Sequence, residues 1–321
     1  MTIDGADPST PPRSTRSPRR GLTATVVVVA LVALGIDLSG SLSRGRVDPS
    51  PAPTTGSSGT APTTGSSTGP TDTSTPSVAG PTLDHGYLAT RAEVLERARL
   101  ARDGVQPYRA AVDDLLMWAH GAVRRDPRPA ERLRIRGTEG PFVDDTAAAY
   151  GLALAYLVSG DRDYAAASTR FIMAWVDTTT TTRDTCPDDG ACQTSLIISR
   201  TVPGFVFAAD LLAGPDGLTQ PQDERFRAWL RDIMLPTASE LGNNWGDAGT
   251  FTRVVLTDYL GDTAGFEAAV AKWRTLLDDV GADGHIPAEV ARERAGLGYT
   301  QEALDYKVAA AWIAGRRGVD L

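Results

Sequence analysis

The chain has 321 residues, of which 41% are hydrophobic, and its formal net charge is −8. Six arginines and five aspartates fall in residues 1–82, so this part carries +1 and the remainder carries −9. An acidic region does not attract nucleic acid through its overall field, so we expect no nucleic-acid partner. A polyanion would have to be bound by arginines gathered in a cleft.

Residues 1–40 have the pattern of an export signal. The basic flank "RSTRSPRR" precedes a continuous apolar run, "LTATVVVVALVALGI", over residues 22–36. This run is short for a membrane-spanning helix, which needs about 20 residues, and it suits a signal peptide or a signal anchor. We therefore expect an extracellular protein, either secreted or attached to the outer face of the cell membrane through residues 22–36.

A change of composition separates a linker from a folded domain. Residues 41–82 are rich in Ser, Thr, Pro and Gly, and "PTTGSS" occurs in them twice. Because such a tract cannot bury a core, we expect a disordered linker. Residues 83–321 are rich in Ala, Leu, Val and aromatic residues, enough for one large core. We expect this domain to be a monomer.

Helical periodicity runs through the whole predicted domain, and we find no strand or hairpin pattern. The breaks carry Gly or Pro, as in "DGVQP" and "TVPG", which are residues that end and begin helices. Helices are predicted within residues 91–125 (two, around "DGVQP"), 144–160, 161–179, 195–214, 219–241, 245–262, 263–284 and 300–321. Successive helices of similar length favour an all-α toroid or solenoid of paired antiparallel helices.

Two cysteines, Cys186 and Cys192, stand close together in "CPDDGAC". In an oxidising compartment a turn-rich loop of this length closes into a disulfide. A metal site would need more ligands, and the three histidines are scattered through the sequence. Phosphate-loop, dinucleotide and nucleophile-elbow motifs are also absent, so we expect neither a metal nor a cofactor.

The first polar cluster is "GNNWGD", which contains Asn243, Asn244 and Trp245. Paired amides beside an aromatic ring can bind a sugar, because the ring stacks on it and the amides bond its hydroxyl or carboxylate groups. Alternatively, the segment is a helix C-cap and loop, where Asn and Gly are common.

The second cluster is "GHIPAEVARERAGLGYT", residues 284–300. Pro287 begins a helix that we expect to end near Ala295, because Gly296 and Gly298 disfavour a continuous helix. A tight turn would then present Tyr299 beside Arg292, which makes the tyrosine a candidate acid or base. The alternative is a helix of ion pairs with Tyr299 as a core aromatic residue.

In order and spacing, these segments resemble the alginate lyase family of α/α-toroid polysaccharide lyases. The resemblance runs from "LDHGYLAT" to "GRRGVDL". It is carried by "VDDTAAAYGLALAYLVSGDRDYAAASTRFIMAWVDT", by "NNW" where the family has Asn-Asn-His, and by "DGHIPAEVARERAGLGYTQEAL". The resemblance implies an incomplete toroid, because the family usually continues after the last helix. It also implies cleavage of an acidic, uronate-containing polysaccharide such as alginate by β-elimination, without a metal.

Carried over by position, the resemblance implies that Asn244 binds the uronate carboxylate and that Arg292 supports both the carboxylate and Tyr299. Tyr299 would be the acid and could also be the base. Trp245 replaces the family histidine, and tryptophan cannot transfer a proton. Further substrate contacts are expected from Asn243, Trp245, His285 and Glu289.

Two other functions remain open at the level of sequence. Trp245 also suits a non-catalytic glycan-binding module on the same scaffold. A glycoside hydrolase would instead need a carboxylate pair across a cleft, such as Asp145 or Asp247 with Glu289.

Overall fold

The computed structural model describes residues 86–134, 138–182 and 193–321, and these are mostly helical, which confirms the predicted all-α class. In chain order the elements are α3 (Arg91–Arg102), α4 (Tyr108–Ala122), β1 (Arg132–Leu133), α5 (Glu139–Ser159), α6 (Arg162–Thr178), β2 (Thr181–Thr182), α7 (Gln193–Thr201), α8 (Pro203–Leu211), α9 (Gln220–Trp229), α10 (Asn244–Leu260), α11 (Thr263–Asp278), α12 (Pro287–Val290) and α13 (Gly296–Arg316). A π turn (Leu230–Met234) and a 3-10 turn (Leu235–Thr237) extend α9, and a second 3-10 turn (Glu293–Ala295) precedes α13. The two short strands pair in parallel.

Two helix pairs are built around the same Gly-Asp turn. Gly160 ends α5 with a φ of 76°, and Gly261 ends α10 with a φ of 72°, a left-handed conformation that glycine adopts without steric cost. The aspartates that follow, Asp161 and Asp262, cap the next helices by accepting a backbone N–H hydrogen bond. A two-residue turn between packed helices makes them antiparallel, as the sequence predicts.

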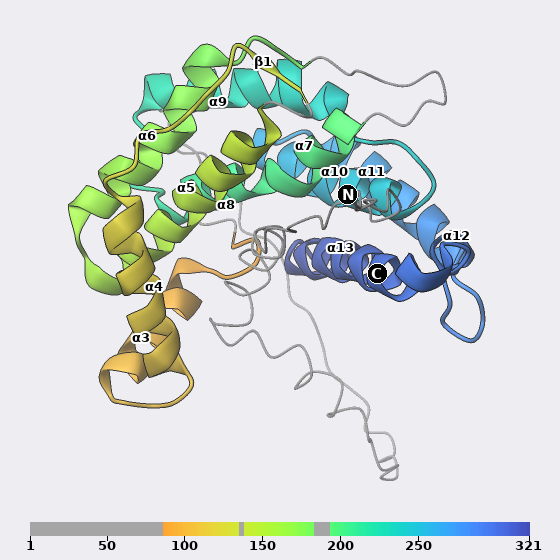
Figure 1. The fold of residues 1–321 in the computed structure, drawn as a ribbon, viewed down its shortest axis with the longest axis horizontal. Helices are drawn as coiled ribbons and strands as arrows, with labels where there is room; N and C mark the ends of the chain where they lie inside the picture. The colour runs from red at the N-terminus through yellow and green to blue at the C-terminus, as the bar shows by residue number, and fades with distance from the viewer. Residues whose placement is uncertain (1–85, 135–137, 183–192) are drawn as a thin grey trace, which may run out of the picture.

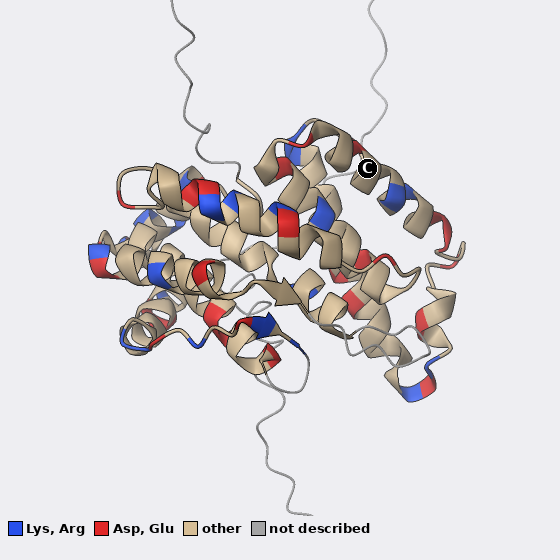
Figure 2. Cartoon of the chain, turned by 90° about the horizontal axis from the view of Figure 1, so that it is seen from above, with Lys and Arg blue, Asp and Glu red and all other residues tan. Residues whose placement is uncertain are grey.

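The helix pairs form a curved row (Figure 1). Helix α5 packs against α6 and α8, while α10 packs against α7, α11 and α13. This row of paired helices fits the predicted α/α toroid. In the view from above, basic and acidic residues are scattered over the helices among the other residue types (Figure 2).

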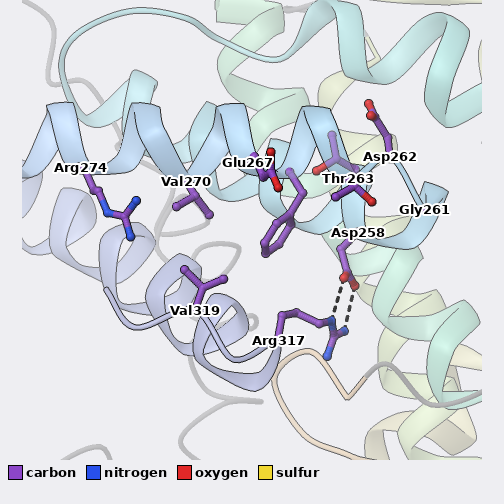
Figure 3. A pocket seen from close by; sticks show the side chains of 11 residues that line it. Asp258, Gly261, Asp262, Thr263, Glu267, Val270, Arg274, Arg317 and Val319 are labelled. Carbon is purple, nitrogen blue, oxygen red and sulfur yellow. Dashed lines mark hydrogen bonds and ion pairs between the residues drawn. The ribbon is translucent and has the colours of Figure 1, made fainter.

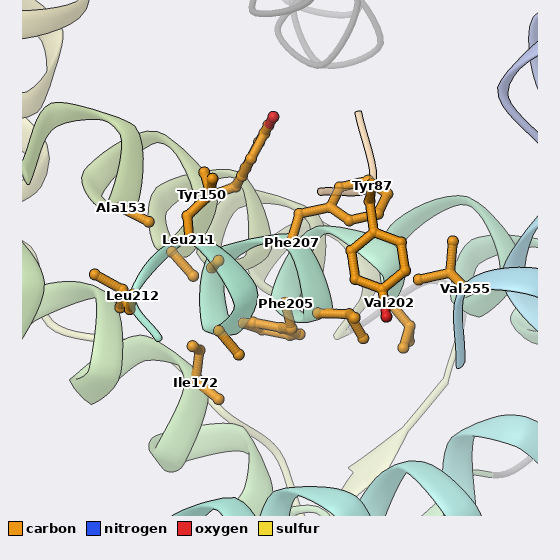
Figure 4. Close-up of a cluster of buried hydrophobic side chains, with 14 of the residues drawn as sticks. Tyr87, Tyr150, Ala153, Ile172, Val202, Phe205, Phe207, Leu211, Leu212 and Val255 are labelled. Carbon is orange, nitrogen blue, oxygen red and sulfur yellow. The ribbon is translucent and has the colours of Figure 1, made fainter. Parts of the chain in front are cut away.

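Aromatic side chains form much of the core between the helices. The ring of Phe142 meets Trp175 edge-on with centroids 4.8 Å apart, and it lies 5.8 Å from the ring of Phe205. A second part of the core contains Tyr87, Tyr150 and Phe207 (Figure 4). Tyr87 is buried at the start of the described chain, so this segment belongs to the folded domain.

Helix α13 is joined to α3 and to α10. Arg316 of α13 pairs with Glu93 of α3 at 2.8 Å, and Arg317 pairs with Asp258 of α10 at 2.7 Å. The Arg317 guanidinium also lies over the ring of Tyr87, 5.5 Å from its centroid. These contacts fix α13 at its C-terminal end, and its N-terminal end carries Tyr299.

Several predictions concern residues outside the described ranges. They are the export signal (1–40), the linker (41–82) and the Cys186–Cys192 disulfide, and they stay predictions. Among the residues that the structure describes, no helix is long and apolar enough to cross a membrane.

Candidate active site

The segment "GNNWGD" begins a helix rather than ending one. Asn243 is the N-cap of α10, and its side-chain oxygen accepts a hydrogen bond of 3.0 Å from the backbone N–H of Trp245. The C-cap expected as an alternative is therefore wrong. Asparagine is common at both ends of helices, so its presence alone does not show whether the segment begins or ends a helix. Trp245 is half-buried, whereas Asn244 is completely buried.

The second cluster also differs from the prediction in its helix boundaries. Helix α12 ends at Val290, and α13 begins at Gly296, so Gly298 and Tyr299 lie in the first turn of a long helix. A Cβ on Gly296 would lie 3.0 Å from the backbone oxygen of Glu289 and 3.2 Å from the Cα of Val290. Glycine is thus favoured here by the close approach of α12 to α13, which outweighs its low helix propensity.

The structure brings Asn244, Arg292 and Tyr299 together. The Nη2 atom of Arg292 lies 3.3 Å from the Oδ1 atom of Asn244. The same guanidinium lies over the ring of Tyr299, 4.3 Å from its centroid, which is a cation–π contact. A guanidinium, an amide and a phenol thus meet at the junction of α10, α12 and α13.

Glu289 is completely buried and contacts both the N-terminus of α10 and Arg292. Its Oε1 atom accepts a hydrogen bond of 2.8 Å from the backbone N–H of Asn244, at the N-terminus of α10. Its Oε2 atom lies 3.0 Å from Nε of Arg292, at ion-pair distance but not aligned for a hydrogen bond. A carboxylate is favoured at a helix N-terminus and beside a guanidinium, so Glu289 holds Arg292 against α10.

Sequence analysis missed two charged residues of this cluster. The Nδ2 atom of Asn244 donates a hydrogen bond of 3.2 Å to Oε2 of Glu302, and the Oε1 atom of Glu302 forms an ion pair with Arg200 of α7. Arg200 also hydrogen-bonds Tyr306, whose pKa is raised to about 12 by burial. The one signal in the sequence was for Arg200, which lies two positions after the apolar run "LII".

Asn243 lines a small groove beside the cluster. The groove measures about 180 Å³, and the buried side chains of Asp247 and Lys307 lie along it. Their ion pair has an N–O distance of 2.5 Å, and Lys307 also donates to the backbone oxygen of Leu276. Burial raises the pKa of Asp247, against the opposite effect of Lys307.

His285 lies in the turn before α12 and pairs with Asp283. The roles expected for Asn243, Trp245, His285 and Glu289 as substrate contacts stay predictions.

A larger groove lies elsewhere. It measures about 480 Å³, is lined by the end of α10, the start of α11 and the C-terminal residues, and contains the Asp258–Arg317 pair (Figure 3). It shares no residue with the cluster around Asn244, so its size does not mark it as the active site.

The carboxylates considered for a glycosidase are engaged by protein groups. Asp145 is buried, pairs with Arg125 at 3.2 Å and accepts a hydrogen bond of 2.9 Å from Trp175. Burial raises the pKa of Asp145, while these donors act in the opposite direction. Across the described residues, no group of three or more His, Cys, Asp or Glu side chains could hold a metal ion.

The family model for alginate lyase matches residues 96–321. The chain belongs to the alginate lyase family. It is therefore a polysaccharide lyase, and the predicted family and enzyme class are confirmed. No curated protein sequence matches the chain.

Solved alginate lyases share the fold of this family member. An alginate lyase from Bacteroides ovatus has 19% identity and a TM-score of 0.58, with 71% of this chain and 76% of that chain covered. Alginate lyase A1-III from Sphingomonas species A1 has 17% identity and a TM-score of 0.55, with coverages of 71% and 70%. A histidine-to-alanine variant of A1-III complexed with a tetrasaccharide has 17% identity and a TM-score of 0.58, with coverages of 76% and 72%.

Proposed function

We propose that the protein is an exported lyase that cleaves a uronate-containing polysaccharide, such as alginate, by β-elimination. The convergence of Asn244, Arg292 and Tyr299 at one helix junction supports this proposal. Export rests on the sequence of residues 22–36 and on the linker that follows. The solved relatives named as alginate lyases support the choice of alginate as the first substrate to test.

The reaction needs three contributions from the protein. Asn244 binds the uronate carboxylate and Arg292 supports it, which makes the neighbouring C5 proton more acidic. A base takes the C5 proton, the C4–O4 bond breaks as a C4=C5 double bond forms, and an acid protonates O4. Tyr299 supplies the base as the phenolate and then, once it has taken the C5 proton, supplies the acid. A positioned acid–base group contributes about 10²- to 10⁴-fold in rate.

Trp245 determines which form of the reaction the site supports. Since an indole takes no proton from carbon, the two proton transfers fall to Tyr299 on one face of the sugar, a syn elimination. Trp245 is half-buried beside Asn244 in the first turn of α10, and its ring serves as a stacking surface for a sugar.

The test follows the ultraviolet absorbance of the new alkene during incubation with polymannuronate, polyguluronate, polygalacturonate and a neutral glucan. We expect absorbance to rise with at least one uronan and not with the glucan. Tyr299→Phe should lower the rate about 100-fold or more, while Tyr164→Phe, a half-buried tyrosine on α6, should not. Uronan binding without turnover in the unmodified protein would instead support a glycan-binding module.

A further inference from the structure

Asn244 is completely buried, although its proposed role is to bind a substrate carboxylate. Its side chain is held from two sides, with Oδ1 facing Arg292 and Nδ2 facing Glu302. A guanidinium only donates hydrogen bonds and a carboxylate only accepts them, so the two neighbours fix the orientation of the amide. A substrate carboxylate can reach Nδ2 only if one of these neighbours moves.

Glu302 is the neighbour that a substrate carboxylate can replace. Its carboxylate accepts from Nδ2 of Asn244 and is paired with Nη2 of Arg200, so an amide and a guanidinium hold one carboxylate between α10 and α7. The same kinds of donor would bind a uronate. The side chain of Glu302 is 21% exposed, so it can rotate toward solvent. Arg292, by contrast, is anchored to the buried Glu289.

Arg200 has further capacity to bind an anion. Its side chain is 32% exposed, so an incoming ligand can reach it. Its Nε atom is buried and, within the described residues, has no hydrogen-bond partner. A guanidinium can bind a carboxylate through two parallel N–H groups, and Arg200 uses Nη2 for Glu302.

We propose that Asn244 and Arg200 form the carboxylate site of this enzyme and that Glu302 occupies it in the free protein. Arg200 is then a substrate-binding residue, and Glu302 is an internal competitor whose release opens the site to a uronate. This inference rests on the proposed function for the identity of the ligand. The apparent affinity for a uronate is lowered by the fraction of molecules in which Glu302 holds the site.

The site can be tested without any lyase activity. Glu302→Ala removes the Cγ and carboxylate atoms that correspond to one acetate ion, so acetate should fill the space. We expect sodium acetate to raise the melting temperature of Glu302→Ala above its value in sodium chloride of equal ionic strength. The unmodified protein and Glu240→Ala should show no such difference, because Glu240 forms an exposed pair with Arg253 outside the cluster. The double variant Arg200→Gln/Glu302→Ala should lose the response.

The proposed carboxylate site is overturned if acetate does not raise the melting temperature of Glu302→Ala, or if it raises that of Glu240→Ala equally. The second measurement is the calorimetric affinity for a mannuronate trisaccharide. Glu302→Ala and the more conservative Glu302→Gln should bind it more tightly, on the order of tenfold. Weaker binding to both variants overturns the competitor role. If acetate fills the site but no uronan is cleaved by the unmodified protein, the proposed function fails and the carboxylate site stands.

Discussion

The guanidinium of Arg292 contacts Tyr299 through the face of the ring, at 4.3 Å from the centroid. The contact requires a flat cation, because a guanidinium stacks on a ring while its N–H groups bond in its own plane. Its Nη2 atom donates a hydrogen bond to Asn244, and its Nε atom lies at ion-pair distance from Glu289. Arg292 therefore positions both Tyr299, the proposed acid, and Asn244, which is proposed to bind the substrate carboxylate.

Arg292→Lys keeps the positive charge and removes the planar fork. We expect kcat/KM on the uronan to fall about 100-fold, because misplacing the reacting groups by about 1 Å has an effect of this size. Arg274→Lys is the matched control, since Arg274 is exposed on α11, and it should keep full activity. A rate for Arg292→Lys within twofold of the unmodified protein would contradict a stacking role.

Glu289→Gln tests the buried support under the site. The substitution removes the charge that pairs with Arg292 and weakens the acceptor for the N–H of Asn244. We expect the free energy of unfolding, measured with urea, to fall by about 1.5–3 kcal/mol, as for other hydrogen bonds to charged groups. Glu240→Gln, in an exposed pair, should leave it unchanged. Equal effects in the two variants would remove Glu289 from this supporting role.

Local chemistry made much of the fold predictable. The helix breaks after Arg102, at Gly160 and at Pro203 lie where the sequence predicts them. Proline restricts the backbone and glycine allows it further conformations, and both effects are local, so they do not depend on the rest of the fold. The meeting of Arg292 and Tyr299 was also expected, since both lie within one short segment. The start of α13 was misplaced because the close approach of α12 at Gly296 is a tertiary effect.

Glu302, the carboxylate partner of Asn244, and Arg200, which pairs with Glu302, could not be predicted in this way. Arg200 and Glu302 are 102 residues apart and meet only because α7 and α13 both lie against α10. Each reads in the sequence as an ordinary charged helix residue. The burial of Asn244 depends on the same three helices, so neither its position nor its partners follow from the motif "NNW".

The buried pair of Asp247 and Lys307 should matter mainly for stability. Each side chain is at most 5% exposed, so removing one partner leaves an uncompensated charge. We expect Asp247→Asn to lower the free energy of unfolding by about 3–5 kcal/mol. The double variant Asp247→Leu/Lys307→Met should recover most of this loss, because it leaves no charge behind. Glu96→Gln, in an exposed pair with Arg99, should cause no measurable change. If the double variant is less stable than Asp247→Asn, the pair stabilises the fold beyond the compensation of its own charges.

Tyr306 gives a prediction for alkaline pH. Burial raises its pKa in the folded protein to about 12, whereas an unfolded tyrosine titrates near the ordinary value. The folded state thus keeps the proton that the unfolded state loses. Its stabilising contribution is complete below about pH 10 and is lost as the pH rises toward about 12, by about 2–3 kcal/mol.

The measurement compares urea unfolding at about pH 9 and about pH 11 for the unmodified protein and for Tyr306→Phe. Buried Tyr150 and Tyr259 also have raised pKa values, so both proteins should lose stability over this range. Tyr306→Phe should lose less, because it lacks one of the titrating groups. The phenolate absorbance should therefore rise at a higher pH in the folded protein than in the unfolded chain. The same loss of stability in both proteins would mean that burial does not raise the pKa of Tyr306.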